Sequence, residues 1–248
     1  MAMRPILFNT EMVRAILDGR KTATRRLVKP QPVCYGPNKA FDAHDGDFFL
    51  SAEKNRLRCR TCGHDPEYSR EGSGIAHRWE PPFCAGDILY VRETWAHPSQ
   101  TEIANGADPK KYLFKADDLP PCAWDKWNPS IHMPKEAARV FLRVKCVSVN
   151  QLQNITEADA IKEGVPDEWP MDPVYCPECK GEGLVGALHP ATLGFMEIDC
   201  PYCEKAVTRF ANLWNSTIKP ADLPTYGWDA NPWVWVIEYE RISREGDG

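Results

Sequence analysis

Four cysteines in the C-terminal part of the chain have the spacing of a metal site. Cys176 and Cys179 form one C-x-x-C pair, and Cys200 and Cys203 form a second. Each pair can present two thiolates from one tight turn, and two such turns complete a tetrahedral zinc site with Zn–S distances of about 2.3 Å. Four thiolates leave no position open for a substrate, so we predict a structural zinc ion, with disulfides or free thiols as the alternatives.

A third pair, Cys59 and Cys62, is a candidate half of a second metal site. The residues that could complete it are irregularly spaced along the chain: Cys34, His64, His77 and Cys84. A single C-x-x-C pair also arises by accident, so the second site stays an open alternative. In a reducing cytoplasm, the ten cysteines of this chain are more typical of metal ligands or buried thiols than of disulfides.

The stretch "DGRKTATRRLVKP", residues 18–30, places two threonine hydroxyls among five cationic side chains. The whole chain has a net charge of −5, but residues 1–30 contain seven Lys or Arg and two Asp or Glu, which makes this segment positive. This balance excludes a strongly basic protein that binds nucleic acid tightly and without sequence preference. It allows a local patch for a few phosphates or one polar ligand. The alternative is a solvated cap at the C-terminus of a helix.

The apolar patterning predicts about five strands and three helices, spread along the whole chain. We expect Thr10 to be the N-cap of the first helix and Thr156 the N-cap of the second. The expected strands are residues 4–9, 88–95, 112–116, 138–152 and 232–242, and the expected helices are residues 10–19, 154–165 and 206–218.

The order of these elements favours one α+β domain over residues 1–248, with a mixed β-barrel, rather than two domains in series. Two segments lack a place in that barrel. Residues 34–84 are rich in Gly, Pro, Asp and Arg and are interpreted as an irregular insertion. Residues 174–206 form the cysteine insertion.

The segment "GRKTATRR" resembles the G-x-K-x-x-T-x-R signature of the ASCH domain, a PUA-like β-barrel family. Gly19, Lys21, Thr24 and Arg26 occupy the four signature positions. The segments "RPILFN", "GDILYVRETW", "NPSIHMP", "LQNITEADAIKEGV" and "WVWVIEYERI" are similar to other parts of the family. The arrangement resembles the long ASCH proteins encoded by phages and prophages. The barrel similarity covers about half of the chain and leaves out the cysteine-bearing insertions.

This resemblance implies a PUA-like barrel with flanking helices and a cleft that binds a nucleoside, a nucleotide or single-stranded RNA. One branch of the family is an amidohydrolase that removes acetate from N(4)-acetylcytidine with a Lys, a Thr and a Glu. The matching residues here are Lys21, Thr24 and Glu163. The chain is more than twice the minimal length of the family, so its insertions could cover or reshape the cleft. The alternatives are a ribonuclease of the same family, or a phage RNA- or protein-interaction factor without enzyme activity, whose zinc module binds a protein partner.

The implied chemistry is amide hydrolysis. Thr24 would attack the carbonyl carbon, and Lys21, made neutral by desolvation among arginines, would take the hydroxyl proton. Glu163 would hold the amino group of the base or protonate the leaving amine. Arg26 would stabilise an oxyanion or bind a phosphate. Residues 21 and 24 face opposite sides of a regular strand, so this set requires an irregular backbone just after Gly19.

Seven further residues are candidate ligand contacts: Arg20, Arg25, Arg26, Arg92, Glu93, Trp95 and His132. Arg92 and Glu93 alternate along an expected strand, and a solvated rim charge is the alternative for each. Trp95 could stack on a base, but most tryptophans serve the core first. For His132 the alternative is a hydrogen bond within its loop.

The start of the chain, "MAMRPILFNT", lacks the long apolar core of a signal peptide. The sequence also lacks the run of about 18 apolar residues that a membrane span requires. We therefore expect a cytoplasmic protein, in the cytoplasm of the bacterial host if a phage encodes it, without a membrane partner.

Overall fold

The computed structural model divides the chain into two compact units. It describes residues 3–33, 47–51, 56–61, 63, 79–120, 123–165, 179, 184–188, 194–200, 203 and 205–243. The first unit consists of Met1–Thr24, Pro82–Val147 and Ile237–Gly248, and the second of Arg25–Pro81 and Ser148–Val236. Each unit joins segments that are distant in sequence, so the units are not domains in series. The expectation of one domain with two insertions stays a prediction.

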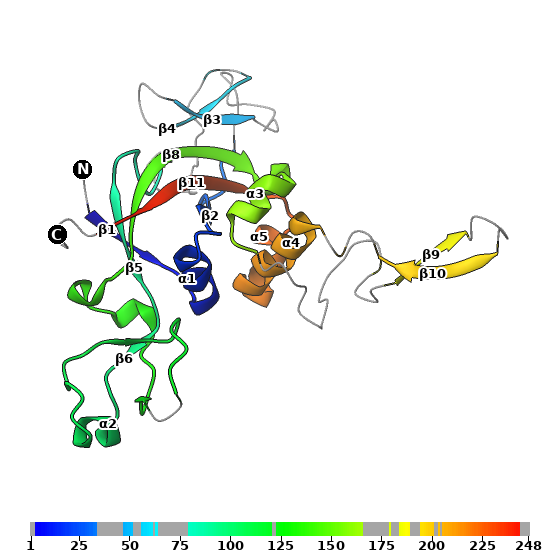
Figure 1. Cartoon of the computed structure of the whole chain (residues 1–248). Coiled ribbons are helices and arrows are strands. Elements are labelled where there is room, and N and C mark those ends of the chain that lie inside the picture. The colour runs from blue at the N-terminus through cyan, green and yellow to red at the C-terminus, as the bar shows by residue number, and fades with distance from the viewer. Residues whose placement is uncertain are drawn as a thin grey trace. The chain divides into compact units, whose positions relative to one another are not determined.

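The largest sheet has five strands in the order β1-β5-β8-β11-β2 (Figure 1). Their bounds are Met3–Leu7 for β1, Ile88–Arg92 for β5, Phe141–Gln151 for β8, Trp233–Ile242 for β11 and Ala23–Leu27 for β2. β1 is parallel to β5, and β5 is antiparallel to β8. β1 and β2 lie at the two ends of this order, so in the described residues the sheet is open. The fold is a mixed, mostly sheet architecture, and the expected closed barrel is not formed.

In the first unit, apolar alternation positions β5 and the helix that follows β1. Leu89 and Val91 of β5 are buried because alternate residues of a strand share a face. Helix α1 (Thr10–Leu17) buries Val13 and Ile16. Its N-cap is Asn9, whose side chain accepts a hydrogen bond from the N–H of Met12 at 2.9 Å. The expected helix is confirmed, but Thr10 as its N-cap was wrong.

The rest of the first unit consists of short elements. The expected strand over residues 88–95 is divided between β5 and β6 (Trp95–Ala96), and β6 pairs antiparallel with β7 (Leu113–Phe114). Helix α2 (Gln100–Ala104) begins after Ser99, whose hydroxyl accepts from the N–H of Glu102. Two 3-10 turns, Ser130–His132 and Lys135–Ala137, lead into β8.

In the second unit, helices α3 (Glu157–Lys162) and α4 (Ala206–Thr217) pack against each other (Figure 1). Thr156 is the N-cap of α3 as expected, and its hydroxyl accepts from the N–H of Asp159 at 3.1 Å. The Glu157 carboxylate accepts from the N–H of Ala206 at 2.8 Å, at the start of α4. The apolar face of α4 joins a buried cluster with β11 and the end of β8: Leu152, Ile155, Ala160, Val165, Ala206, Phe210, Trp214, Val234 and Val236.

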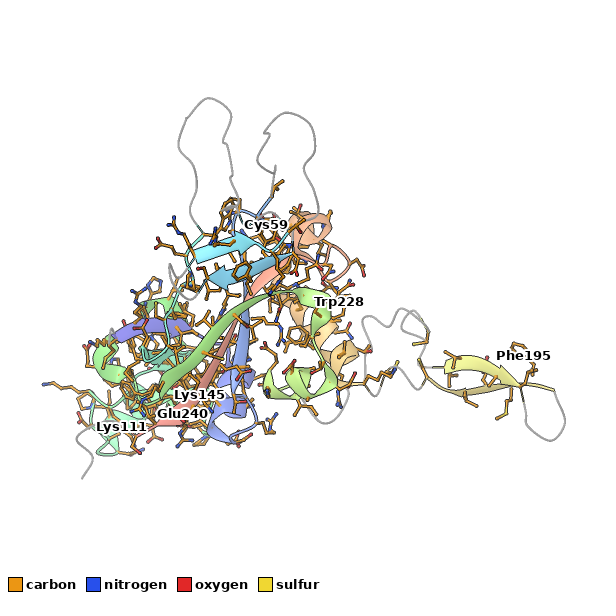
Figure 2. The ribbon with its side chains drawn as sticks, turned by 90° about the horizontal axis from the view of Figure 1, so that it is seen from above. Cys59, Lys111, Lys145, Phe195, Trp228 and Glu240 are labelled. Carbon is orange, nitrogen blue, oxygen red and sulfur yellow. The ribbon has the colours of Figure 1, made fainter. Side chains whose placement is uncertain are left out.

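Shorter elements complete the second unit. They are the 3-10 turns Leu152–Asn154 and Pro220–Asp222, the helix α5 (Leu223–Tyr226), the hairpin of β3 (Phe48–Ser51) with β4 (Arg56–Cys59), and the hairpin of β9 (Leu184–Leu188) with β10 (Phe195–Asp199). The β3–β4 hairpin lies in the segment expected to be irregular, so that expectation was wrong for these residues. Phe195 on β10, labelled in Figure 2, is strongly exposed. None of the described helices combines the length and the apolar character needed to cross a membrane.

Candidate functional site

The backbone just after α1 is irregular, as the Lys21–Thr24 signature requires. Gly19 has φ +77°, a left-handed conformation that glycine adopts without the strain a side chain would add. The chain therefore turns back, and the N–H of Lys21 donates to the carbonyl oxygen of Ala15 at 2.9 Å. β2 begins only at Ala23, so the alternation of a regular strand does not determine where Lys21 points.

In the first unit, Lys21 and Thr24 are buried, with exposed fractions of 2% and 3%. The Nζ atom of Lys21 lies 5.6 Å from the centroid of the Phe8 ring. A solvated helix cap would keep its cations in water, so that alternative was wrong for Lys21. It suits Arg20, which is partly exposed and pairs with Asp18 at 3.1 Å.

In the second unit, Arg25 and Glu163 form a buried ion pair. Nη1 of Arg25 lies 3.0 Å from Oε1 of Glu163, and each side chain is only 4% exposed. Nη2 of Arg25 also lies 3.9 Å from Oδ2 of Asp159. The Arg25 guanidinium is 5.8 Å from the ring centroid of Phe210, which places it between α3 and α4. Within the described residues, the buried Nε of Arg25 has no hydrogen-bond partner.

Helix α3 positions the two carboxylates that face Arg25. Glu163 is the C-cap of α3, and its N–H donates to the carbonyl oxygens of Asp159 and Ala160. Burial raises the pKa of Asp159, but the Thr156 hydroxyl and the charges of Arg25 and Lys162 outweigh it, so the pKa lies below the ordinary value. Asp159 is therefore ionised at neutral pH, on the same side of α3 as the pair.

These observations divide the sequence-predicted catalytic set. The structure brings Arg25 and Glu163 together, and it places Lys21 and Thr24 in buried positions of the same signature stretch. That Glu163 joins Lys21 and Thr24 in one catalytic set stays a prediction. Arg26, expected to bind an oxyanion or a phosphate, is half-buried on β2.

Glu93 is buried in the first unit rather than solvated at a rim. It is 1% exposed and lies just beyond the end of β5, so it does not alternate with Arg92 along a strand. Arg139 donates from Nε and Nη2 to the two carboxylate oxygens of Glu93, each at 3.0 Å. Desolvation raises the pKa of Glu93, and the hydrogen bonds and charge of Arg139 oppose that effect only in part. The rim-charge interpretation of Glu93 was wrong.

The other candidate contacts in the first unit have individual roles. Arg92 donates from Nε to the carbonyl oxygen of Met133 at 2.9 Å and fixes the loop before β8. Trp95 packs edge-on against Tyr112 and His97 at ring-centroid distances of 5.7 and 5.3 Å. His132 is exposed on its 3-10 turn. Arg92 and Trp95 therefore support the scaffold, whereas His132 faces solvent.

Three of the four predicted zinc ligands meet in the second unit. The sulfur atoms of Cys179, Cys200 and Cys203 lie within 4.8 Å of one another, and those of Cys179 and Cys203 are 3.4 Å apart. In a tetrahedral site with Zn–S distances near 2.3 Å, sulfur atoms are separated by about 3.8 Å. None of the three forms a disulfide within the described residues, and the N–H of Cys203 donates to the Cys200 carbonyl oxygen, which forms the tight turn. This cluster can hold a metal ion; Cys176 lies outside the described residues.

The second metal site is less complete. Cys59 is buried at the end of β4 and forms no disulfide within the described residues. Cys84, in the first unit, is exposed, and its N–H donates to the Asp87 carboxylate. The remaining residues considered for this site lie outside the described part of the chain: Cys34, Cys62, His64 and His77. The second metal site stays a prediction.

Arg139 and Asp117 are polar residues that the sequence analysis missed. Nη1 of Arg139 donates to both carboxylate oxygens of Asp117, at 2.8 and 2.9 Å. Both residues stand outside the apolar patterns and match no motif, so only the fold brings them to Glu93.

No protein-family model matches the chain, and neither a curated protein nor a solved structure matches it.

Proposed function

We propose that this chain is an ASCH-type protein that binds a nucleoside, a nucleotide or single-stranded RNA, and that it hydrolyses the amide of an acylated pyrimidine nucleoside such as N(4)-acetylcytidine. The observation that carries the proposal is the burial of the signature. Lys21, Thr24 and Arg25 are almost fully buried, and so is Glu163, far away in the sequence. Burying cations and carboxylates is costly unless they are compensated. The burial of three polar side chains of one short stretch therefore favours a site over a solvated surface.

The proposed reaction proceeds in two steps. The Thr24 hydroxyl oxygen bonds to the amide carbonyl carbon while Lys21, as the neutral amine, takes the hydroxyl proton. The C–N bond then breaks, and the leaving amine takes the proton from the Lys21 ammonium, while the Glu163 carboxylate accepts a hydrogen bond from the amino group of the base. Water next attacks the threonine ester, which releases the carboxylic acid and restores the Thr24 hydroxyl.

Arg25 supports this proposal by holding Glu163. A carboxylate that accepts a hydrogen bond from a buried guanidinium at 3.0 Å keeps one orientation, and orientation is a large part of what a catalytic group contributes. The Arg25 side chain therefore has a positioning role.

We assign zinc to the cysteine cluster as part of the same proposal. Thiolates are soft ligands that favour Zn(II) over Mg(II) or Ca(II), and Cys176 would complete four sulfur ligands. Such a closed site stabilises the fold around it and leaves no coordination position for a substrate. The proposed hydrolysis therefore uses side chains of the chain and not the metal.

The test incubates the purified chain with N(4)-acetylcytidine. The release of cytidine and acetate is measured by chromatography. Lys21→Ala, Thr24→Ala and Glu163→Gln should each nearly abolish turnover, while Thr24→Ser should retain part of it because the hydroxyl remains. Thr22→Ala is the matched control, because Thr22 lies in the same stretch but is exposed. It should keep full activity.

The outcomes separate hydrolysis from binding. No turnover by the wild-type chain on any acylated nucleoside would refute the amidohydrolase part. Nucleoside or RNA binding would then be measured with the same variants, and binding that Lys21→Ala leaves unchanged would refute the assignment of this stretch as the site. Cleavage of RNA by the wild type but not by Lys21→Ala would favour the ribonuclease alternative.

A further inference from the structure

The first unit contains a surface hollow of about 770 Å³ that the proposed reaction does not use. It lies beside the start of β8 and the end of β11. Aromatic, charged and hydroxyl side chains contribute to its lining, and the ones that matter here are Tyr112, Phe114, Glu136, Arg139, Arg241 and Ser243. The size of the hollow is within the range of small-molecule sites, which are about 300–1,000 Å³.

The planar guanidinium group of Arg139 is held in one orientation in this hollow. Four hydrogen bonds to the carboxylates of Glu93 and Asp117, each between 2.8 and 3.0 Å, hold the edges of its guanidinium. The guanidinium carbon lies 4.0 Å from the ring centroid of Phe114, so the ring packs against one face of the guanidinium. An arginine held in this way has lost its side-chain freedom before any ligand arrives, which lowers the entropic cost of binding.

The charge around Arg139 argues against a phosphate as its ligand. Arg139 and Arg241 are the two cations that line the hollow, and three carboxylates oppose them: Glu93 and Asp117 beside Arg139, and Glu136 in the lining. Their potential would repel an anion close to Arg139. The Arg139 side chain is nevertheless 29% exposed, and it lines the hollow. What it offers to a ligand is therefore the face of the guanidinium rather than an unbalanced positive charge.

We propose that this hollow binds an uncharged, planar heteroaromatic ring of the nucleobase class, stacked on the face of Arg139. Bases stack on arginine planes as well as on aromatic rings. The Tyr112 and Ser243 hydroxyls and the Glu136 carboxylate supply acceptors for the amino groups of such a ring. A free nucleoside and an unpaired base of single-stranded RNA present the same ring. This site lies wholly in the first unit and does not depend on Glu163 or on amide hydrolysis.

The experiment uses the full chain with Lys21→Ala, so that binding at the proposed reaction site does not contribute. Adenosine, cytidine, a trinucleotide and ribose are titrated separately by calorimetry, and the cross-peaks of the Arg139 Nε–H and the Ser243 amide are followed by NMR. Adenosine or cytidine, or the trinucleotide, should bind and shift both signals, whereas ribose should not. Binding of the nucleosides would identify free nucleosides as ligands, and binding of the trinucleotide alone would identify an RNA base.

Two variants and one control test the role of Arg139. Arg139→Lys keeps the positive charge but removes the planar guanidinium. It should weaken binding by roughly tenfold, because the stacking of one base is lost. Ser243→Trp fills the rim at an exposed position without touching Glu93, and should also weaken binding. Arg143→Lys, on β8 shortly after Arg139 but outside the lining, should change nothing. Equal binding of ribose and nucleosides, no binding at all, or full affinity in Ser243→Trp would overturn the proposal.

Discussion

Replacing Glu163 by alanine should destabilise the protein by about 3 kcal/mol, at the low end of the range of about 3–5 kcal/mol for breaking a buried ion pair. The Arg25 and Glu163 side chains are each 4% exposed, so water cannot take the place of the lost carboxylate. Asp159 offsets part of the cost, because its lowered pKa keeps it ionised and it lies 3.9 Å from the guanidinium. That remaining partner is why we expect the low end of the range.

An exposed ion pair in the same protein provides the control. Arg143 and Glu240, the latter labelled in Figure 2, are 3.5 Å apart with side chains 45% and 48% exposed. Solvent screens such a pair, so Glu240→Ala should cost less than about 1 kcal/mol. The difference between the two alanine variants measures the effect of burial on an ion pair.

The assay is urea unfolding at fixed zinc concentration and neutral pH, followed by tryptophan fluorescence. Arg25→Met combined with Glu163→Leu should recover most of the stability lost in Glu163→Ala, because apolar side chains leave no buried charge without its partner. If Glu163→Ala loses no more stability than Glu240→Ala, Glu163 does not compensate the buried charge of Arg25 as we expect. The role of Arg25 in holding Glu163 would then fall as well.

Three further predictions concern the helix turn, the Glu93 pair and the cysteine cluster. Gly19→Ala should lower stability by about 1–2 kcal/mol, because φ is +77° while nothing lies within 4 Å of the added Cβ; a higher melting temperature would contradict this. Since burial raises the pKa of Glu93 above 4.5, its contribution to stability is largest below pH 4.5 and falls as the pH rises through the folded-state pKa. The stability of the wild type relative to Glu93→Gln should therefore decrease from pH 4 towards pH 7, and a constant difference in thermal melts would contradict this. Cys200→Ser should reduce bound zinc, measured by elemental analysis, and leave the helical circular dichroism of α4 largely intact; unchanged zinc content would refute the assignment of the ligands.

Local patterns were sufficient to predict α1, α3 and α4, but not the short helices α2 and α5 or every strand. The face of α1 and the N-cap of α3 follow from nearby residues, because helical contacts are short in range. β2 was not expected, because "ATRRL" has no apolar alternation. It forms a strand by pairing with β11 at one edge of the sheet. The first N-cap was misplaced by one residue because Asn9 and Thr10 are both good capping residues, and only the hydrogen bond to Met12 decides between them.

The residues of the candidate site that belong to a sequence motif were predictable, whereas the ion pairs between residues distant in sequence were not. The cysteine spacing and the position of Lys21 after a glycine turn are visible in the sequence. The partner of Glu163 is not, because Arg25 is separated from it by most of the chain and stands at a variable position of the signature. Glu93 was expected at a solvated rim, since nothing near it in sequence indicates that Arg139 would meet it in a buried position.

The hydrogen bond from the N–H of Ala206 to the Glu157 carboxylate fixes where the cysteine insertion ends. The insertion lies between α3 and α4 in the sequence, and these two helices pack against each other. Closing a loop between two points that are already neighbours depends only weakly on the length of the loop. The insertion can therefore be lengthened, shortened or exchanged in evolution at little cost to the sheet. The metal-binding cluster and the buried signature are then free to change under separate selection.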